Sequence, residues 1–251
     1  MHIWNKVRPA RAGKLAHILV GPYVFYFPSL LYFEGLFTEI FFKGTYHLAA
    51  TPAPIRAIDC GANIGVSLLY IKVRAPQARV LCFEPNPAAR AILEKNVAIN
   101  GWNETVRVLP YALGKEKGTV DFFVDSDMAT SSGGSLARYS KNKNELTSYT
   151  VEVDILSRYI DGMLDFLKMD IEGAEFVVLE ELIAQKKMPY IAALQLEYHY
   201  IPGFFTRPLS DLLTLLAIEG FRTAVLPNAS TYRTDMCDDM QTAMVSAWRS
   251  R

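Results

Sequence analysis

Small residues and carboxylates gather where predicted strands end, and their spacing suits the binding of a nucleoside-containing ligand. The strand predicted at 55–60 carries Asp59 near its end and runs into the turn Gly61-Ala62-Asn63-Ile64-Gly65, which precedes a helix. Glu84 ends the next strand, predicted at 79–84. A turn of small residues lets a ligand approach the backbone near a helix N-terminus. An acidic residue that ends the following strand can bind a ribose diol.

The glycine spacing distinguishes between two nucleotide cofactors. Dinucleotide-binding enzymes carry G-x-G-x-x-G, whereas this turn has Gly61-x-x-x-Gly65 with Asn63 in the middle. A carboxylate at the end of the first strand, here Asp59, is a mark of enzymes that use S-adenosylmethionine. The pattern therefore favours S-adenosylmethionine over NAD. Further candidate cofactor contacts follow the second and third strands: Pro85, Asn86, Tyr111 and Ala112.

A second acidic group follows the strand predicted at 165–170. Asp170, Glu172 and Glu175 stand together at a strand-to-helix turn. Acidic residues near a helix N-terminus are favourable by about 0.3–1 kcal/mol each, which accounts for Glu175 more readily than for Asp170. We expect Asp170 to face both the cofactor and the acceptor, together with Glu172. Lys168 lies within the strand and is expected to pair with a carboxylate of a neighbouring strand.

Two further candidates, Glu197 and His199, lie two residues apart at the end of the strand that begins at 190, hence on one face if the pairing is regular. His199 is the best candidate general base because the unperturbed pKa of histidine is near neutrality, and Glu197 is the alternative. A lone histidine on a strand is also often structural. The carboxylates of Asp170, Glu172 and Glu197 offer oxygen ligands for Mg²⁺, but we favour catalysis without a metal.

From residue 55 onward the predicted strands and helices alternate, which indicates a parallel sheet covered by helices on both faces. The fold class is thus α/β and Rossmann-like, with a seven-stranded, mostly parallel sheet and an antiparallel edge strand from a final hairpin. Such an ending is common in methyltransferases that use S-adenosylmethionine. The predicted strands are 55–60, 79–84, 105–109, 165–170, 190–197, 221–226 and about 240–247, with an antiparallel pair at 119–124 and 148–153. The predicted helices are 65–75, 87–100, 154–161, 173–187 and 208–219.

Length and charge restrict the classes of function. The chain has 251 residues, 51% of them hydrophobic, and its 26 basic residues balance its 26 acidic ones. We expect one large domain at 51–251 behind an N-terminal aromatic-rich extension at 1–50 that packs on it. Neutral charge argues against a nucleic-acid partner. The polar stretch 125–148 is expected to be a mobile loop, either a solvated connection or a substrate lid.

The extension leaves the location of the protein open. Basic residues precede Leu15–Phe33, which contains no Asp, Glu, Lys or Arg and so superficially resembles a signal anchor. Gly21, Pro22 and Pro28 interrupt it. We therefore favour a cytoplasmic protein in which Tyr23 to Phe27 forms a short strand. Membrane association and a homodimer contact through the aromatic side chains are the alternatives.

The motifs together resemble the FkbM family of S-adenosylmethionine-dependent methyltransferases. The resemblance covers roughly residues 34 to 226 and depends on three blocks of sequence. These are Ile58-Asp-Cys-Gly-Ala-Asn-Ile-Gly65 with Phe83-Glu-Pro-Asn-Pro87, Tyr111-Ala-Leu-Gly114, and Leu167-Lys-Met-Asp-Ile-Glu-Gly-Ala-Glu175. The resemblance implies a class I methyltransferase fold. It also implies that Glu39 and Tyr46, in a Glu-x-Phe segment followed by a Tyr, line the methionine end of the cofactor.

The expected function is therefore O-methylation of a hydroxyl on a sugar, a glycan or a small secondary metabolite. Three other classes are less consistent with the sequence. A nucleotide-dependent oxidoreductase conflicts with the glycine spacing, and a nucleic-acid methyltransferase conflicts with the neutral charge. The third is a non-catalytic scaffold that binds S-adenosylmethionine or a membrane, which the complete acidic group at 170–175 disfavours.

Overall fold

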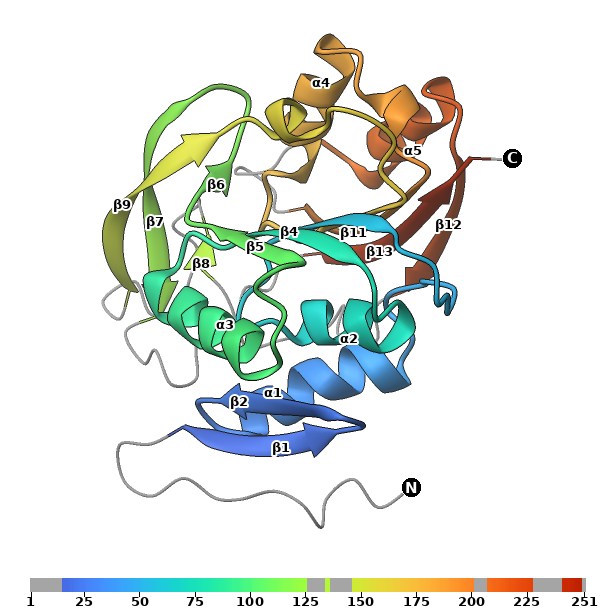
Figure 1. Cartoon of the computed structure of the whole chain (residues 1–251). Helices are drawn as coiled ribbons and strands as arrows, with labels where there is room; N and C mark the ends of the chain where they lie inside the picture. The colour runs from blue at the N-terminus through green and yellow to red at the C-terminus, as the bar shows by residue number, and fades with distance from the viewer. Residues whose placement is uncertain (1–14, 126–133, 136–145, 201–206, 228–240, 250–251) are drawn as a thin grey trace.

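The fold is built on a seven-stranded sheet with the strand order β12-β13-β11-β10-β3-β4-β5. A computed structural model describes residues 15–125, 134–135, 146–200, 207–227 and 241–249 (Figure 1). The strands of this sheet are β3 (Arg56–Cys60), β4 (Arg79–Phe83), β5 (Val106–Leu109), β10 (Phe166–Met169), β11 (Ala193–Tyr200), β12 (Arg222–Pro227) and β13 (Gln241–Trp248). β13 pairs antiparallel with β11 and with the edge strand β12, whereas the inner pairs are parallel. The predicted α/β class is confirmed.

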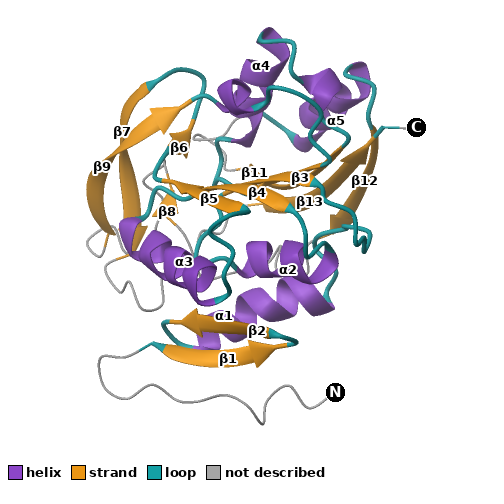
Figure 2. Ribbon diagram, viewed as in Figure 1, coloured by secondary structure: helices purple, strands orange, loops and turns teal. Residues whose placement is uncertain are grey.

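Helices cover both faces of the sheet (Figure 2). α2 (Val66–Arg74) and α3 (Pro87–Ile99) lie on one face, and α4 (Glu175–Ala184) and α5 (Leu209–Ile218) lie on the other. Two hydrophobic cores result, one for each face. Such double coverage explains why the central strands are nearly continuous apolar runs. Because these strands are parallel, their β-to-α turns all lie at one edge of the sheet.

Local sequence signals set where α3 begins. Asn86 is its N-cap, and the side-chain oxygen of Asn86 accepts hydrogen bonds from the backbone N–H groups of Ala88 and Ala89. Pro87 occupies the first helical position, where its missing N–H costs nothing. The cap therefore fixes the exit of the chain from β4, directly after Glu84.

The N-terminal segment forms a hairpin, β1 (Ala16–Val20) and β2 (Tyr23–Phe27), followed by α1 (Leu30–Phe37) and the π-helix η2 (Thr38–Phe42). β2 has the predicted bounds, whereas α1 and η2 were not predicted. Asn96 of α3 bonds to the backbone N–H and carbonyl of Tyr26, which ties the hairpin to the domain. Within the described residues, none of the helices has the length and apolar character needed to span a membrane.

A second, smaller sheet follows β5. It contains β6 (Ala112–Leu113), β7 (Gly118–Asp125), β8 (Gly134–Ser135) and β9 (Leu146–Asp154). β7 and β9 pair antiparallel, as the sequence predicted. Most of the stretch 125–148, expected to be mobile, lies outside the described residues. Short 3₁₀ turns, η3 (Leu156–Tyr159) and η4 (Met188–Tyr190), complete the fold.

Candidate functional site

The turn between β3 and α2 is closed by its own hydrogen bonds. Gly61 and Ala62 both donate their N–H groups to the Phe83 carbonyl, and Gly65 donates to Ala62. The Asn63 N–H donates to Glu84, and the Ile64 N–H donates to the Asn63 side chain. Every backbone N–H of the turn is thus already used. A ligand at this turn would therefore contact a surface whose backbone N–H groups already have hydrogen-bond partners.

Gly61 allows the turn to touch the neighbouring strand. Its φ is +76°, and a Cβ added to it would lie 1.9 Å from the Asp170 carbonyl oxygen. Gly65, the N-cap of α2, has a φ of +96°. Both glycines are required by geometry, since side chains strain this region of φ and the first position has no room for one. The turn and the loop after β10 are therefore in direct contact.

Glu84 is the carboxylate that the turn holds in place. Its Oε2 accepts from the Asn63 N–H at 2.7 Å and its Oε1 accepts from the Asn86 N–H at 2.8 Å. Burial raises the pKa of Glu84 to about 7, although these two backbone hydrogen bonds lower it. A carboxylate oxygen has two lone pairs, so each oxygen keeps one for a further donor.

Asp59 lies beneath the turn rather than at its surface. The side chain is fully buried, and its Oδ2 accepts from the Ser67 hydroxyl at 2.6 Å. Lys168 reaches it from β10, with Nζ 3.3 Å from Asp59 Oδ1, and donates to the Gly61 carbonyl at 2.6 Å. The expected carboxylate partner of Lys168 is thus Asp59. In this arrangement Asp59 supports the turn through Lys168 and presents no surface to a ligand.

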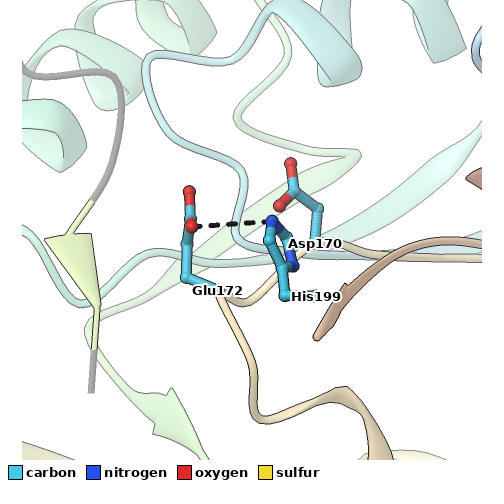
Figure 3. Close-up of side chains that lie close together, drawn as sticks. All are labelled: Asp170, Glu172 and His199. Atoms are coloured by element: carbon cyan, nitrogen blue, oxygen red, sulfur yellow. Dashed lines mark ion pairs between the residues drawn. The ribbon is translucent and has the colours of Figure 1, made fainter. Parts of the chain in front are cut away.

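Three of the predicted catalytic side chains meet beside this turn (Figure 3). Asp170, Glu172 and His199 each offer one donor atom, and these atoms all lie within 4.8 Å of one another. His199 Nε2 is 3.6 Å from Glu172 Oε2. Glu197, on the same strand as His199, is not in this group of three. The oxygen ligand set considered for a metal had Glu197 as its third member, whereas His199 is the third member of this group.

Glu175 holds His199 from behind. Its Oε1 lies 3.0 Å from His199 Nδ1 and accepts from the N–H groups of Ile171 and Gly173 at 3.1 Å each. Both side chains are buried. Glu175 was expected only to favour the helix N-terminus. It is the first residue of α4, but it also orients the imidazole.

The surroundings of His199 differ from those assumed for a general base. Burial alone would lower its pKa, but the carboxylates of Glu175 and Glu172 raise it well above the ordinary value. A raised pKa keeps the ring protonated over a wider pH range, which disfavours His199 as the group that accepts a proton. Burial and the nearby Asp170 carboxylate raise the pKa of Glu197 to about 8.

The remaining candidates occupy less direct positions. Asn86 caps α3 with its side chain, and the Pro85 carbonyl accepts from Arg90. Tyr111 is half-buried just before β6, in which Ala112 is buried. Glu39 lies in the π-helix η2, and its carbonyl accepts from Thr45.

Tyr46 and Tyr32 bring the N-terminal segment to the site. The Tyr46 ring is buried, with its centroid 5.9 Å from Lys168 Nζ. The Tyr32 hydroxyl donates to the Asn63 side chain at 2.8 Å. Burial raises the pKa of Tyr32, and the carboxylates of Glu84, Glu172 and Asp170 add to this effect. Tyr32 was not predicted, because nothing distinguished it from the other aromatic residues of its segment.

Two features define a Rossmann-like methyltransferase fold. The first is the strand order, in which the antiparallel strand β13 lies next to the edge strand. The second is the glycine turn after β3, which lies beside Glu84 at the carboxyl edge of the sheet. Comparison with known proteins agrees. The model of the methyltransferase FkbM domain matches residues 59–223. The chain belongs to the FkbM family of methyltransferases.

The individual relatives are similar to this chain at low sequence identity. Methyltransferase sdnD of Sordaria araneosa is 31% identical over 186 residues, which cover 62% of this chain and 71% of the relative. The 2-O-methyltransferase NoeI of Sinorhizobium fredii is 25% identical over 53% of this chain and 58% of its own length. The crystal structure of methyltransferase FkbM from Methylobacillus flagellatus KT has a TM-score of 0.51 at 19% identity. It matches over 84% of this chain but 47% of its own, and it supports the fold alone.

Proposed function

We propose that this methyltransferase takes its methyl group from S-adenosylmethionine and transfers it to a hydroxyl of a sugar, a glycan or a small secondary metabolite. One observation carries the choice of cofactor. Glu84 ends β4 beside the turn between β3 and α2, with both carboxylate oxygens fixed by backbone N–H groups and each with a lone pair left over. A ribose diol offers two donors that suit such a carboxylate.

The described residues fit this cofactor along the edge of the sheet. Glu84 would hold the ribose, and the closed turn from Gly61 to Gly65 would form the wall beside it. Tyr46 and Glu39 approach from the N-terminal segment and would line the methionine end. When bound, S-adenosylmethionine supplies a methyl group on a sulfonium that needs no further activation.

The acceptor hydroxyl needs alignment and a group that takes its proton. Asp170 and Glu172 provide carboxylates at the end of the site nearest His199, and Glu197, with its pKa raised to about 8, becomes a carboxylate as the pH rises. Because Glu175 and Glu172 keep His199 charged, we assign the proton to a carboxylate rather than to the imidazole. His199 then faces Glu172 as a cation, with Nε2 3.6 Å from Oε2.

One comparison and one feature of the site support oxygen as the acceptor atom. NoeI, a relative at 25% identity, is by its name a 2-O-methyltransferase. The site also presents carboxylates, which suit a hydroxyl that must lose a proton. The balanced neutral charge of the chain argues for a small or glycan acceptor over a nucleic acid.

Calorimetric titration with S-adenosylhomocysteine, with NADH as the comparison ligand, tests the cofactor. We expect micromolar binding of S-adenosylhomocysteine alone. Glu84→Gln should weaken it at least tenfold, because the amide nitrogen cannot accept from a hydroxyl. Glu94→Gln is the matched control, since Glu94 lies on α3 with a side chain 58% exposed, and it should bind normally.

Transfer itself is tested by release of S-adenosylhomocysteine, followed by mass spectrometry, in the presence of glycosides and hydroxylated metabolites. The expected product carries one added methyl group on oxygen. A folded protein that binds NADH, or that binds neither ligand, would contradict the proposal.

A further inference from the structure

The group of Asp170, Glu172 and His199 has the dimensions of a metal site. Its three donor atoms lie within 4.8 Å of one another. Ligands on opposite sides of a cation at about 2.0–2.2 Å are about 4.4 Å apart, and adjacent ligands are closer. The side chains of Asp170 and Glu172 are 26% exposed, so small rotations can close the remaining distance.

An independent feature is the way His199 is held. It is 3% exposed, and its Nδ1 is fixed by the buried Glu175. Its Nε2 points toward the Glu172 carboxylate, beside Asp170 (Figure 3). At 3.6 Å that carboxylate is beyond hydrogen-bond distance, so Nε2 faces Glu172 without a direct hydrogen bond to it. A histidine that binds a metal commonly donates its other N–H to a carboxylate in this manner.

Charge at the site favours an added cation. The charged carboxylates that ion pairs place at the cluster are Asp59, Asp170, Glu172 and Glu175, and the cations paired with them are Lys168 and His199. Two further acidic side chains contribute, since Glu197 acts on His199 and Glu39 acts on Glu197, and the pKa of Glu197 is raised to about 8. Lys168 is largely committed to Asp59 and to the carbonyls of Cys60 and Gly61. A divalent ion at the cluster would replace the proton on Nε2 and offset the excess of acidic groups.

We propose that Asp170, Glu172 and His199 bind a divalent transition-metal cation, with Glu175 as the residue that positions His199. Two carboxylates and one imidazole suit Mn²⁺ or Zn²⁺ better than Ca²⁺ or Mg²⁺, which prefer oxygen ligands alone. Three protein ligands leave positions for water and for an acceptor hydroxyl. A bound hydroxyl becomes more acidic, so its proton passes more readily to a nearby carboxylate. That role depends on the proposed function, whereas binding of the cation does not.

Titration of chelator-treated, dialysed protein with Mn²⁺ alone, followed by electron paramagnetic resonance, tests the site. We expect one bound Mn²⁺ per chain with micromolar affinity. Glu172→Gln should weaken binding at least tenfold, and Glu175→Gln should weaken it about 10–100-fold through loss of the imidazole anchor. Glu94→Gln should bind as the unaltered protein does.

The variants and a second titration distinguish failure of the cation site from failure of the cofactor proposal. Glu172 is partly exposed, so Glu172→Gln should fold, which circular dichroism checks. Absence of Mn²⁺ binding below millimolar concentration, or unchanged binding in Glu172→Gln, would overturn the cation site. S-adenosylhomocysteine is titrated into the same samples with chelator present. Its binding without Mn²⁺ binding overturns the cation site alone, and the reverse result overturns the cofactor proposal alone.

Discussion

Lys168 and Asp59 face each other on two neighbouring parallel strands, and their ion pair lies buried beneath the candidate site. The strand register pairs Lys168 directly with Asp59. Lys168 Nζ lies 3.3 Å from Asp59 Oδ1 and 3.7 Å from Asp170 Oδ2. Burial opposes the charge of Lys168, but Tyr46, Asp59 and Asp170 together raise its pKa well above the ordinary value. One ammonium group thus fixes the turn after β3 and the loop after β10.

We expect Lys168→Met to destabilise the fold by about 3–5 kcal/mol, because it leaves the buried Asp59 charge without its cation. Urea unfolding measures the change. Asp59→Asn in the same chain should recover part of the loss, with a coupling of about 0.5–3 kcal/mol.

Lys72→Met is a matched control for that change. Lys72 is also buried, but it donates to the Ala78 carbonyl and the Thr105 hydroxyl. Neutral partners cost less to abandon, so a loss of about 1–2 kcal/mol is expected. Equal losses in Lys72→Met and Lys168→Met would contradict a special role for the ion pair.

Contact between the turn and the loop after β10 gives a second prediction. Gly61→Ala places a Cβ 1.9 Å from the Asp170 carbonyl oxygen and should cost about 3 kcal/mol or more. Gly101→Ala is the control, since Gly101 has a φ of +67° with no atom within 4 Å of an added Cβ. It should cost about 1 kcal/mol, the penalty of φ alone. Thermal unfolding of both variants compares them, and similar losses would show that the contact is unimportant.

Much of the fold was predictable because short sequence patterns indicate the strands and helices from which it is built. Buried parallel strands are short apolar runs, and Asn86 with Pro87 marks the start of α3. Carboxyl ends of parallel strands meet at one edge, so Asp59, Glu84 and Asp170 were expected to be near one another. Even the partner type of Lys168 followed from the cost of burying a single charge.

The features that were not predicted depend on contacts between residues that are far apart in the sequence. Glu175 meets His199 only because α4 begins where it does, 24 residues before the histidine along the chain. That contact raises the pKa of His199, which disfavours it as a neutral base. Tyr32 reaches Asn63 because α1 packs beside the turn, and nothing in the sequence distinguishes it from the other aromatic residues of its segment. Propensity and spacing do not encode such side-chain encounters.

Asn96 offers a third prediction, on how the N-terminal hairpin is attached. It is fully buried, and it binds the Tyr26 N–H, the Tyr26 carbonyl and the Ile64 carbonyl. Asn96→Ala should cost about 3 kcal/mol, because backbone groups lose their partner. Hydrogen exchange across residues 16–27 should accelerate. The exposed Asn103→Ala should leave stability within about 0.5 kcal/mol, and unchanged exchange in Asn96→Ala would argue against this attachment.

Glu84 gives a fourth prediction, on how cofactor affinity varies with pH. A ribose hydroxyl donates to a carboxylate, so binding requires the ionised form, and the pKa of Glu84 is about 7. The affinity for S-adenosylhomocysteine should therefore rise from pH 6 to pH 8 and then level off. Lys168 and Asp59 also act on Glu84, but with opposite signs. Calorimetry at each pH measures the profile, and a profile that Glu84→Gln leaves unchanged would assign it to another group.

The same carboxylate predicts a loss of stability as pH rises. Its pKa is about 7 in the folded chain against an ordinary value of 4.5, so between these values the unfolded chain releases a proton that the folded chain retains. Unfolding is then favoured by rising pH across this window. The free energy of unfolding of Glu84→Gln, measured relative to the unaltered protein, should rise by about 2–3 kcal/mol between pH 5 and pH 8. A lost hydrogen bond would lower the stability of the variant by the same amount at every pH and would not change this trend. Urea unfolding at several pH values measures the gain. Glu94→Gln should show no such trend, and a flat difference for Glu84→Gln would mean that Glu84 is already ionised at pH 5.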